Sequence, residues 1–205
     1  MYELAIYGGT FAPVHNGHVR AANAFFEAVH PDKLLLIPTL IPPHKQLDFK
    51  DDPKDRLNML HLAFEDHPFY NKKIFVSDYE LSAPPPSYTV NTLRHFTASD
   101  TRITFLVGTD MFLTLDRWYL PEEIFHLSRI ALMKRESESS DISEALSKQE
   151  ILLKEKFNAD IVFVSAPPIE VSSSEIRQGN DKFKQKYLPS KVYKYIKEHS
   201  LYEDQ

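Results

Sequence analysis

The sequence contains no cysteine, which excludes disulfide bonds, a thiol nucleophile and any metal site built on cysteine. It has no apolar run long enough to cross a bilayer, and no basic stretch followed by a long apolar run at its start. We therefore expect no membrane span and no export signal, and by default a cytoplasmic location. Basic residues are fewer than acidic ones, 24 against 29, and the resulting net charge of −5 argues against a nucleic-acid polymer as partner.

What is present is an alternation of short apolar runs and helical patterns over 205 residues, which predicts a single domain spanning residues 1–205. Near-continuous apolar runs are typical of parallel strands that are covered on both faces, so the expected fold class is α/β with a doubly wound parallel sheet. The expected strands are Glu3–Tyr7, Lys33–Pro38, Lys73–Ser77, Arg102–Val107, Ile130–Met133 and Asp160–Val164. The expected helices are Gly17–Val29, Pro53–Asp66, Tyr88–Thr97, Ser143–Phe157 and Ser190–His199. The Ser/Glu-rich stretch from Arg135 to Ser143 is expected to be a solvated loop.

The most informative segment runs from Gly8 to His18, GGTFAPVHNGH, between the first strand and the first helix. This order predicts a strand, a glycine turn and a helix. Glycine lets the backbone approach a ligand closely, and a helix N-terminus attracts phosphate. His15 and His18 are three residues apart, so both imidazoles can face one anion. The segment therefore predicts a nucleotide triphosphate site, although two histidines can also simply cap a helix, and His-x-x-His is a weak zinc motif.

A second polar loop, Gly108-Thr109-Asp110, follows the fourth expected strand. Ligands of doubly wound sheets bind beyond the carboxyl ends of the strands, where the strand order reverses. If the first and fourth strands are neighbours, the two loops form opposite walls of one pocket. Asp110 is then a candidate for holding a ribose hydroxyl or a metal-bound water, and the alternative is a helix N-cap.

The opening segment resembles the signature of the nucleotidyltransferase superfamily, which is related to class I aminoacyl-tRNA synthetases. Within it, the chain is most similar to the bacterial nicotinate-nucleotide adenylyltransferase family over nearly its whole length. The resemblance implies a Rossmann-like nucleotidyltransferase fold with a small C-terminal helical part. Ala12 stands where the family usually has Asp. A methyl group accepts no hydrogen bond, so in this loop the contacts of the family carboxylate are absent or made by water.

The resemblance also implies an ATP site. The segment from Val171 to Gly179 resembles the second superfamily signature, with Ser174 and Arg177 on the β- and γ-phosphates and Ile176 near adenine. An isolated match of this kind would be interpreted as a serine-capped helix with a surface arginine. His15, His18 and Arg177 are the implied catalytic residues. The implied ATP-binding residues are Gly8, Gly9, Thr10, Phe11, His15, His18, Gly108, Asp110, Ser174, Ile176 and Arg177.

The remaining motifs are assigned by resemblance to the mononucleotide substrate. The implied residues are His44, Lys45, Thr89, Trp118 and Tyr119. In the family a tryptophan stacks on the pyridine ring, and backbone N–H groups at positions matching Thr89 and Tyr119 bind its carboxylate. Taken alone, Lys45 would be a solvent-facing lysine, Ser87 or Thr89 a helix cap, and Trp118, the single tryptophan, a core anchor.

The implied reaction is adenylyl transfer from ATP to nicotinate mononucleotide, with release of pyrophosphate, in NAD biosynthesis. Magnesium is expected to bind through the ATP phosphates, and no side chain is assigned as a metal ligand. Two alternatives stay open within the same fold: an adenylyltransferase that uses nicotinamide mononucleotide or phosphopantetheine, and a catalytically weakened nucleotide-binding regulator. Ala12 is the feature that favours the regulator.

Overall fold

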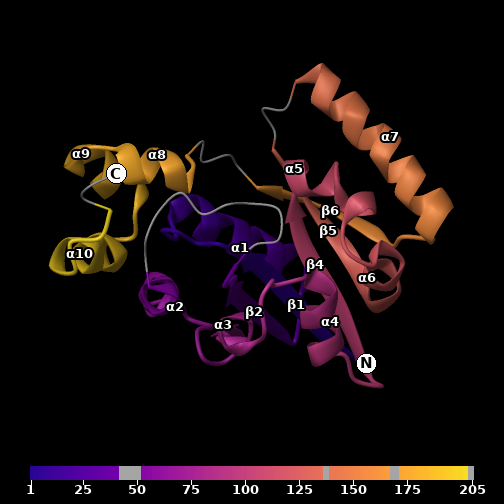
Figure 1. Cartoon of the computed structure of the whole chain (residues 1–205), viewed down its shortest axis with the longest axis horizontal. Coiled ribbons are helices and arrows are strands. Elements are labelled where there is room, and N and C mark those ends of the chain that lie inside the picture. Colours follow the sequence, from indigo (N-terminus) through magenta and orange to yellow (C-terminus); the bar gives the residue numbers. More distant parts are fainter. Residues whose placement is uncertain (42–51, 136–138, 167–170, 203–205) are drawn as a thin grey trace.

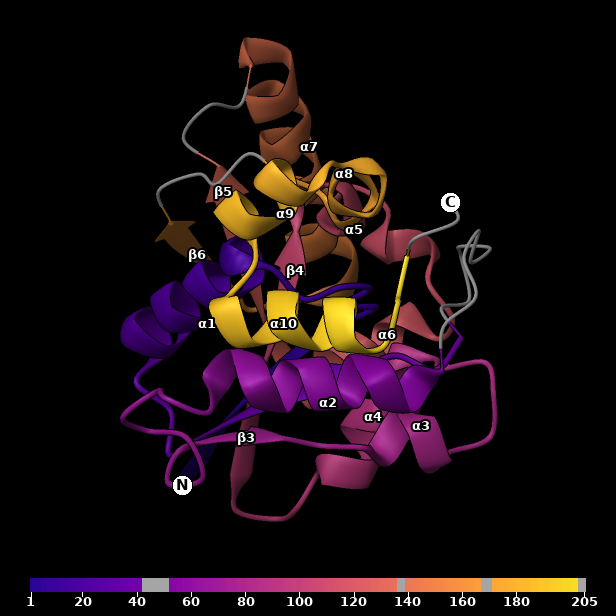
Figure 2. The same cartoon turned by 90° about the vertical axis from the view of Figure 1, so that its left-hand side faces the viewer.

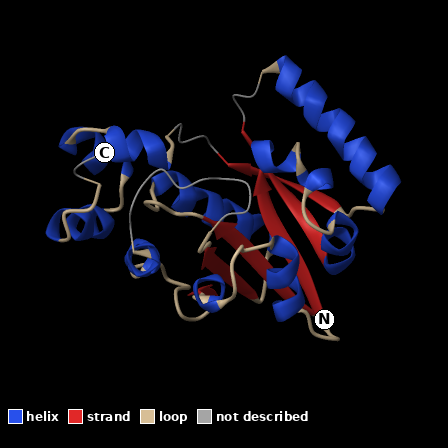
Figure 3. Ribbon diagram, in the orientation of Figure 1, coloured by secondary structure: helices blue, strands red, loops and turns tan. Residues whose placement is uncertain are grey.

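The computed structural model describes residues 1–41, 52–135, 139–166 and 171–202, and its centre is a six-stranded sheet in the order β3-β2-β1-β4-β5-β6 (Figures 1 and 3). Every neighbouring pair of strands is parallel. The strands are β1 Tyr2–Gly9, β2 Lys33–Pro38, β3 Ile74–Val76, β4 Thr101–Gly108, β5 Ser128–Arg135 and β6 Ile161–Ala166. The predicted doubly wound parallel sheet is thereby confirmed.

The strand order reverses at β1. From β1 the chain adds β2 and then β3 on one side of the sheet, and it then adds β4 on the other side of β1. Ile6 of β1 accordingly pairs with Leu35 of β2 and with Phe105 of β4. The predicted neighbourhood of the first and fourth strands is confirmed, so the loops that follow them leave the same edge of the sheet.

Helices cover both faces of the sheet. The longer ones are α1 Asn16–Val29, α2 Pro53–Phe64, α4 Thr89–Phe96, α6 Pro121–Leu127, α7 Ser140–Phe157 and α10 Ser190–Glu198. In Figure 1 the sheet lies between α1, α2 and the C-terminal helices on the left and α4, α6 and α7 on the right. A hydrophobic core lies on each face of the sheet, and successive strand residues point into opposite cores. Ala5 packs with α1 and α2, and its neighbour Ile6 packs with α4 and α6.

The C-terminal helices α8 Ser173–Gln178, α9 Asp181–Tyr187 and α10 form the small helical part of the fold. Figure 2 shows α10 lying side by side with α2, and residues of the two helices are in contact. Val192 and Ile196 of α10 are buried in the same core as Met59 and Leu60 of α2. This packing places α8, which precedes α10 in the chain, against the α1 side of the sheet.

Local chemistry accounts for several helix boundaries. Asp52 caps α2 by accepting a hydrogen bond from the Lys54 N–H, 2.9 Å away, and Pro53 occupies the first helical position. The predicted start of this helix at Pro53 is confirmed. Asn158 ends α7 in the left-handed conformation, which asparagine tolerates well.

Two local predictions are wrong. Gly8 and Gly9 belong to β1, where they pair with Ile37 and Pro38, and no described glycine has a positive φ; the turn residue is Phe11, with φ of 51°. The loop expected from Arg135 to Ser143 is too long, because Ser139 caps α7 and the helix begins at Ser140. The shorter elements α3 Tyr79–Ser82, α5 Thr109–Phe112 and the 3-10 turn η1 Leu115–Arg117 were not predicted, nor were α6, α8 and α9.

Candidate active site

A cavity of about 450 Å³ opens at the carboxyl ends of the central strands. Its walls come from four places in the chain: the end of β1, the residue after β2, the segment from α3 into α4, and the segment after β4. The lining residues used below are Gly8, Gly9, Thr10, Thr39, Glu80, Thr89, Thr92, Asp110, Trp118 and Tyr119. The loops after β1 and β4 therefore border one cavity, as their positions in the sequence predicted.

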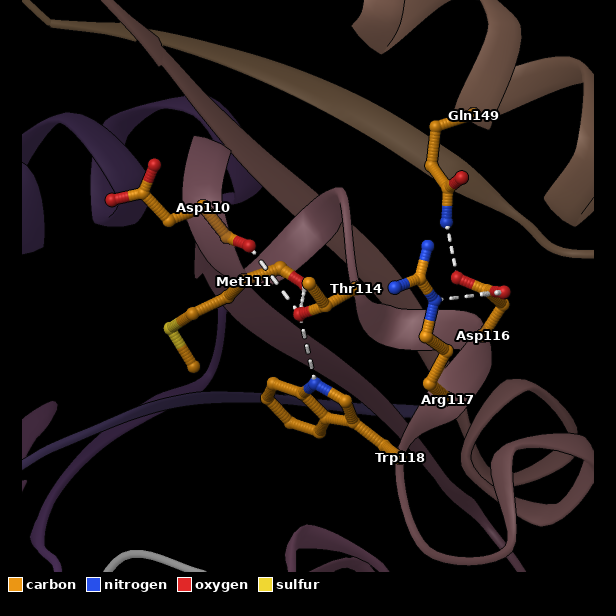
Figure 4. Close-up of polar contacts among 7 residues, drawn as sticks. All are labelled: Asp110, Met111, Thr114, Asp116, Arg117, Trp118 and Gln149. Carbon is orange, nitrogen blue, oxygen red and sulfur yellow. Dashed lines mark hydrogen bonds and ion pairs between the residues drawn. The ribbon is translucent and has the colours of Figure 1, made fainter. Parts of the chain in front are cut away.

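Trp118 is fixed in the cavity wall by its indole nitrogen. The Trp118 Nε1–H donates to Thr114 Oγ1, 3.3 Å away, and the Thr114 hydroxyl faces the carbonyl oxygens of Asp110 and Met111 (Figure 4). Trp118 is half-buried and also packs against the core that contains α4 and α6. The interpretations as a core anchor and as a ring-binding residue are thus compatible, since one side of the indole packs and another borders the cavity.

Two tyrosines complete an aromatic edge of the cavity. The ring centroids of Tyr88 and Tyr119 are 4.5 Å apart, and Tyr119 remains 50% exposed. Helix α4 begins at Thr89 with Tyr88 as its N-cap residue, whose side chain makes no capping hydrogen bond. The alternative of Ser87 or Thr89 as the cap is therefore wrong. Thr89, the first residue of the helix, lines the cavity, and an N–H group at this position has no partner within a helix, so an anion could be bound there.

Both histidines of the opening segment stand at the start of α1. His15 is the N-cap residue, and its backbone N–H donates to Nδ1 of His18, 3.2 Å away. Because Nδ1 of His18 accepts this hydrogen bond, the proton of the neutral imidazole sits on Nε2, which becomes a donor. The capping interpretation thus accounts for one nitrogen of His18 and leaves its other nitrogen as a hydrogen-bond donor.

Burial keeps both imidazoles neutral at pH 7. Burial lowers the pKa of His15 to about 4, against a smaller opposing effect of Glu175. Burial, and then the proximity of His15, hold the pKa of His18 well below its usual value. The His15 side chain is nearly inaccessible, whereas part of His18 reaches the surface. With ring centroids 3.7 Å apart, two charged imidazoles would repel strongly, and a nearby anion would favour protonation of one of them.

The start of α8 contacts the opening segment directly. Arg177 is only 6% exposed, and its Nη1 donates to the carbonyl oxygen of Ala12, 2.8 Å away. Its Nη2 donates to Ser174 Oγ at 3.2 Å, and Ser173 Oγ donates to the carbonyl oxygen of Pro13 at 3.0 Å. The alternative of a surface arginine is therefore wrong, whereas its serine-capped helix is confirmed, because Ser172 Oγ accepts a hydrogen bond from the Glu175 N–H. Two segments about 160 residues apart in the chain meet here.

Ala12 itself is buried. Its methyl group is 1% exposed within the core that contains α1 and α2, and its carbonyl oxygen is the acceptor for Arg177. At this position the backbone, which any residue supplies, makes the contact to the arginine. The replacement of the usual carboxylate by a methyl group therefore leaves the link between the opening segment and α8 in place.

Some assigned residues lie apart from the cavity. Phe11, His15, His18, Gly108, Ser174, Ile176 and Arg177 are not among the described residues that line it. Ile176 is fully buried in the core, and its backbone N–H and carbonyl oxygen bond to Ser172 and Gly179. Its contact with an adenine base stays a prediction. His44 and Lys45 fall outside the described residues. A single cleft that holds the triphosphate against both His18 and Arg177 stays a prediction.

Arg56 is one of the residues of this region that the sequence did not reveal. It lies on α2, where it is fully buried. Its Nη1 donates to the carbonyl oxygens of Thr10 at 3.0 Å and Thr39 at 2.5 Å, and its Nη2 to that of Leu40 at 3.4 Å. Arg56 therefore joins the loop after β1 to the loop after β2. An arginine in phase with the buried positions of a helix is the signal that could have found it.

Asp110 is the exposed acidic residue of the cavity, in the first turn of α5. The N-cap of α5 is Gly108, so the alternative of Asp110 as a cap is wrong. A single exposed carboxylate in the cavity wall is compatible with contact to the water shell of Mg²⁺, which typically keeps several waters and binds through substrate phosphates. In the described part of the chain, no three His, Asp or Glu side chains gather in a way that could hold a metal ion on their own. None of the described helices is both long and apolar enough to cross a membrane.

Comparison with known proteins gives consistent matches. The model of the family described as cytidylyltransferase-like matches residues 6–179. A relative from Clostridium tetani is 34% identical over 98% of this chain and all of its own length, and one from Caldicellulosiruptor saccharolyticus is 33% identical with the same coverage. Both carry the name "probable nicotinate-nucleotide adenylyltransferase".

Solved structures match the fold over the whole chain. The nicotinic acid mononucleotide adenylyltransferase of Plasmodium falciparum, in complex with NaAD, superposes with a TM-score of 0.75 at 18% identity and covers 100% of this chain and 99% of its own. A putative nicotinate-nucleotide adenylyltransferase from Vibrio parahaemolyticus gives a TM-score of 0.61 at 19% identity, with 100% and 98% covered. At this level of identity the two structures establish the shared fold.

Proposed function

We propose that this chain, which belongs to the cytidylyltransferase-like family and within it to the nicotinate-nucleotide adenylyltransferases, transfers the adenylyl group of ATP to nicotinate mononucleotide. The observation that carries the proposal is the cavity between the loops after β1 and β4, with Thr10 on one side and Trp118 on the other. The first loop is anchored to α8 by Arg177, so the two segments that resemble nucleotide-binding signatures are in contact, which supports the proposal. The relatives' shared name supports the choice of substrate.

In this reaction an oxygen of the mononucleotide phosphate forms a bond to the α-phosphorus of ATP, and the bond from that phosphorus to the β-phosphate oxygen breaks. Pyrophosphate leaves with that oxygen. Because both reactants are anions, positioning and charge neutralisation carry the catalysis, and no covalent enzyme intermediate is needed. His18 would donate from Nε2 to the phosphates, and Ser174 and Arg177 would hold the leaving pyrophosphate. Mg²⁺, bound through the ATP phosphates, would supply further neutralisation of charge.

The mononucleotide would occupy the aromatic part of the cavity. Its pyridine ring would lie on Trp118, and the N–H groups of Thr89 and Tyr119 would bind the ring carboxylate. Preference for the acid over the amide follows, because an amide NH₂ facing a backbone N–H would place two donors against each other. His44 and Lys45 are kept as candidates for the mononucleotide phosphate by resemblance alone. A cytoplasmic location likewise stays a prediction.

A pyrophosphate-release assay tests the function. Purified protein with ATP and Mg²⁺ is given nicotinate mononucleotide, nicotinamide mononucleotide, phosphopantetheine or no acceptor. We expect release only with an acceptor and fastest with nicotinate mononucleotide. Equal rates with the two mononucleotides would remove the argument from the ring carboxylate. Tight ATP binding without release under any condition would favour the nucleotide-binding regulator, and release with phosphopantetheine alone would change the substrate class.

A further inference from the structure

The cavity that would take the pyridine ring carries negative charge and no positive charge on its described lining. Glu80 and Asp110 are its acidic side chains, and no lysine, arginine or histidine is among the described residues that line it. Asp110 is exposed, so water screens its charge. Glu80 is 7% exposed, so its charge acts in a much drier setting. An electrostatic preference of the inner cavity must therefore come from Glu80.

Only half of the Glu80 carboxylate is satisfied within the described protein. Oε1 accepts a hydrogen bond from Thr92 Oγ1 at 2.7 Å, whereas Oε2 is buried without a hydrogen-bond partner among the described groups. The hydroxyls of Thr39 and Ser87 are close enough to favour the charged form, but neither makes a well-formed hydrogen bond to Oε2. A buried oxygen without a partner is costly, and such groups in native proteins commonly mark a site for a ligand, water or ion.

The surroundings of Glu80 disfavour the ionised form of its carboxyl group. Burial is the largest effect and raises its pKa, and the three hydroxyls oppose that shift. On its other side Glu80 borders a second cavity of about 420 Å³, whose lining includes Arg94 and His95. The Arg94 guanidinium is already paired with Glu123, 2.5 Å away, and the His95 ring stacks on Tyr79. A cation that entered the first cavity would therefore relieve an existing electrostatic cost.

We propose that Glu80 is the counter-charge for the cationic pyridinium ring of the mononucleotide, and thereby a specificity-determining residue that selects the charged ring over an uncharged one. The inference rests on the proposed function, because that function supplies a substrate with a quaternary ring nitrogen. The indole face of Trp118 attracts the same charge. The ring carboxylate would then bind at the start of α4, away from Glu80, so that each charge of the zwitterionic ring meets the opposite sign.

A purely structural role makes a different prediction. If Glu80 only ties α3 to α4 through Thr92, its replacement would weaken binding of every ring alike, through a loosened cavity wall. If Glu80 neutralises the ring, its replacement would weaken binding of the charged ring specifically. Glu80→Gln separates the two, because the amide keeps an acceptor for the Thr92 hydroxyl and nearly the same volume while removing the charge.

The experiment compares two ligands by calorimetry on the full chain. One is nicotinate mononucleotide, and the other is its 1,4-dihydro form, whose ring carries no positive charge. We expect wild-type protein to bind the oxidised form about tenfold or more tightly than the dihydro form, in line with measured coupling energies of close charge pairs. In Glu80→Gln this ratio should fall clearly below the wild-type value, to the smaller preference that the indole face of Trp118 supplies. Glu27→Gln, which removes the same charge from an exposed position on α1, should keep the wild-type ratio.

The outcomes distinguish the inference from the function on which it rests. A wild-type ratio near one overturns the counter-charge without any variant, as does an unchanged ratio in a folded Glu80→Gln protein. Thermal unfolding without ligand gives an independent measure: loss of a buried, partly unsatisfied charge should leave Glu80→Gln at least as stable as wild type at pH 7. A wild-type protein that binds neither form and releases no pyrophosphate with either mononucleotide overturns the proposed function together with the inference.

Discussion

Arg177 of α8 donates a hydrogen bond from Nη1 to the carbonyl oxygen of Ala12, 165 residues earlier in the chain. Both residues are buried, so the hydrogen bond is little weakened by competition with water. The contact makes the position of the loop after β1 depend on the C-terminal helical part. The guanidinium holds the carbonyl oxygen of Ala12 through Nη1 and the hydroxyl of Ser174 through Nη2, so one side chain links the loop to the start of α8.

Arg177→Gln should damage both stability and turnover. The shorter amide cannot span to Ala12, which leaves a buried carbonyl without its donor, at a cost of about 1–3 kcal/mol in the free energy of unfolding. We expect kcat to fall by about two powers of ten, because a donor to the leaving pyrophosphate is also lost. Chemical denaturation and steady-state pyrophosphate release measure the two effects. Arg20→Gln, at an exposed position of α1, is the control and should change neither.

His18→Ala should reduce kcat by about two powers of ten, since it removes one hydrogen-bond donor to the developing charge. Circular dichroism should show an intact fold, because part of His18 is at the surface and its contact to the His15 N–H is a single hydrogen bond. His95→Ala, on the far side of α4, serves as a histidine control with turnover close to wild type. A His18→Ala enzyme with near-normal turnover would remove the catalytic role of this loop.

Acidification should destabilise the protein between pH 6.5 and about pH 4. His15 has a pKa of about 4 when folded and an ordinary value near 6.5 when unfolded, so within that window the unfolded chain binds more protons. Stability therefore rises with pH across the window and is lost as the pH falls. The low pKa of His18 acts in the same direction. Urea denaturation as a function of pH measures this slope, which should be clearly smaller in the variant His15→Gln. An equal slope in wild type and variant would contradict neutral burial of this imidazole.

The fold was predictable because its signals are local and repeated. Continuous apolar runs such as Ile103–Val107 predicted parallel strands, and Asp52 before Pro53 predicted the start of α2. What failed was conformation set by tertiary contacts. Gly8 and Gly9 resemble a turn in the sequence, but pairing with β2 extends the strand through them, and the turn falls on Phe11. Sequence propensity could not outweigh the register of a neighbouring strand.

Site residues that follow the ends of strands could be predicted from the sequence. Buried polar residues that shape the site through hydrogen bonds to neighbouring elements could hardly be predicted. The loop after β1 and Asp110 follow strands directly, and the strand order brings them to one edge. Glu80 and Arg56 lie in helices, and their importance depends on partners in other elements: Thr92, 12 residues from Glu80, and Thr10, 46 residues from Arg56. One sequence alone does not indicate which carbonyl or hydroxyl group will contact a buried charge in the folded protein.

Trp118→Ala should act on the mononucleotide and not on ATP. Loss of the indole removes the aromatic face of the cavity and the attraction between the ring and the pyridinium, about 1–2 kcal/mol when the site is dry. We therefore expect KM for nicotinate mononucleotide to rise about tenfold, and KM for ATP to stay within about twofold of wild type. Initial rates with each substrate varied in turn measure both constants. Trp118→Phe should recover part of the loss, and an equal rise in both KM values would instead indicate a general collapse of the cavity wall.

Arg56→Lys tests whether the loops after β1 and β2 are held together by the guanidinium. Lysine keeps the charge but offers one compact ammonium group in place of a planar fork, so it cannot reach the carbonyls of Thr10, Thr39 and Leu40 together. The buried charge would lose partners, and we expect the free energy of unfolding to fall by about 3 kcal/mol or more. Because Thr10 and Thr39 both line the cavity, KM for both substrates should rise together, in contrast to the selective effect at Trp118. Lys54→Gln, on the first turn of the same helix and exposed, is the matched control. A destabilised Arg56→Lys protein with unchanged KM values would show that the arginine supports the fold without shaping the site.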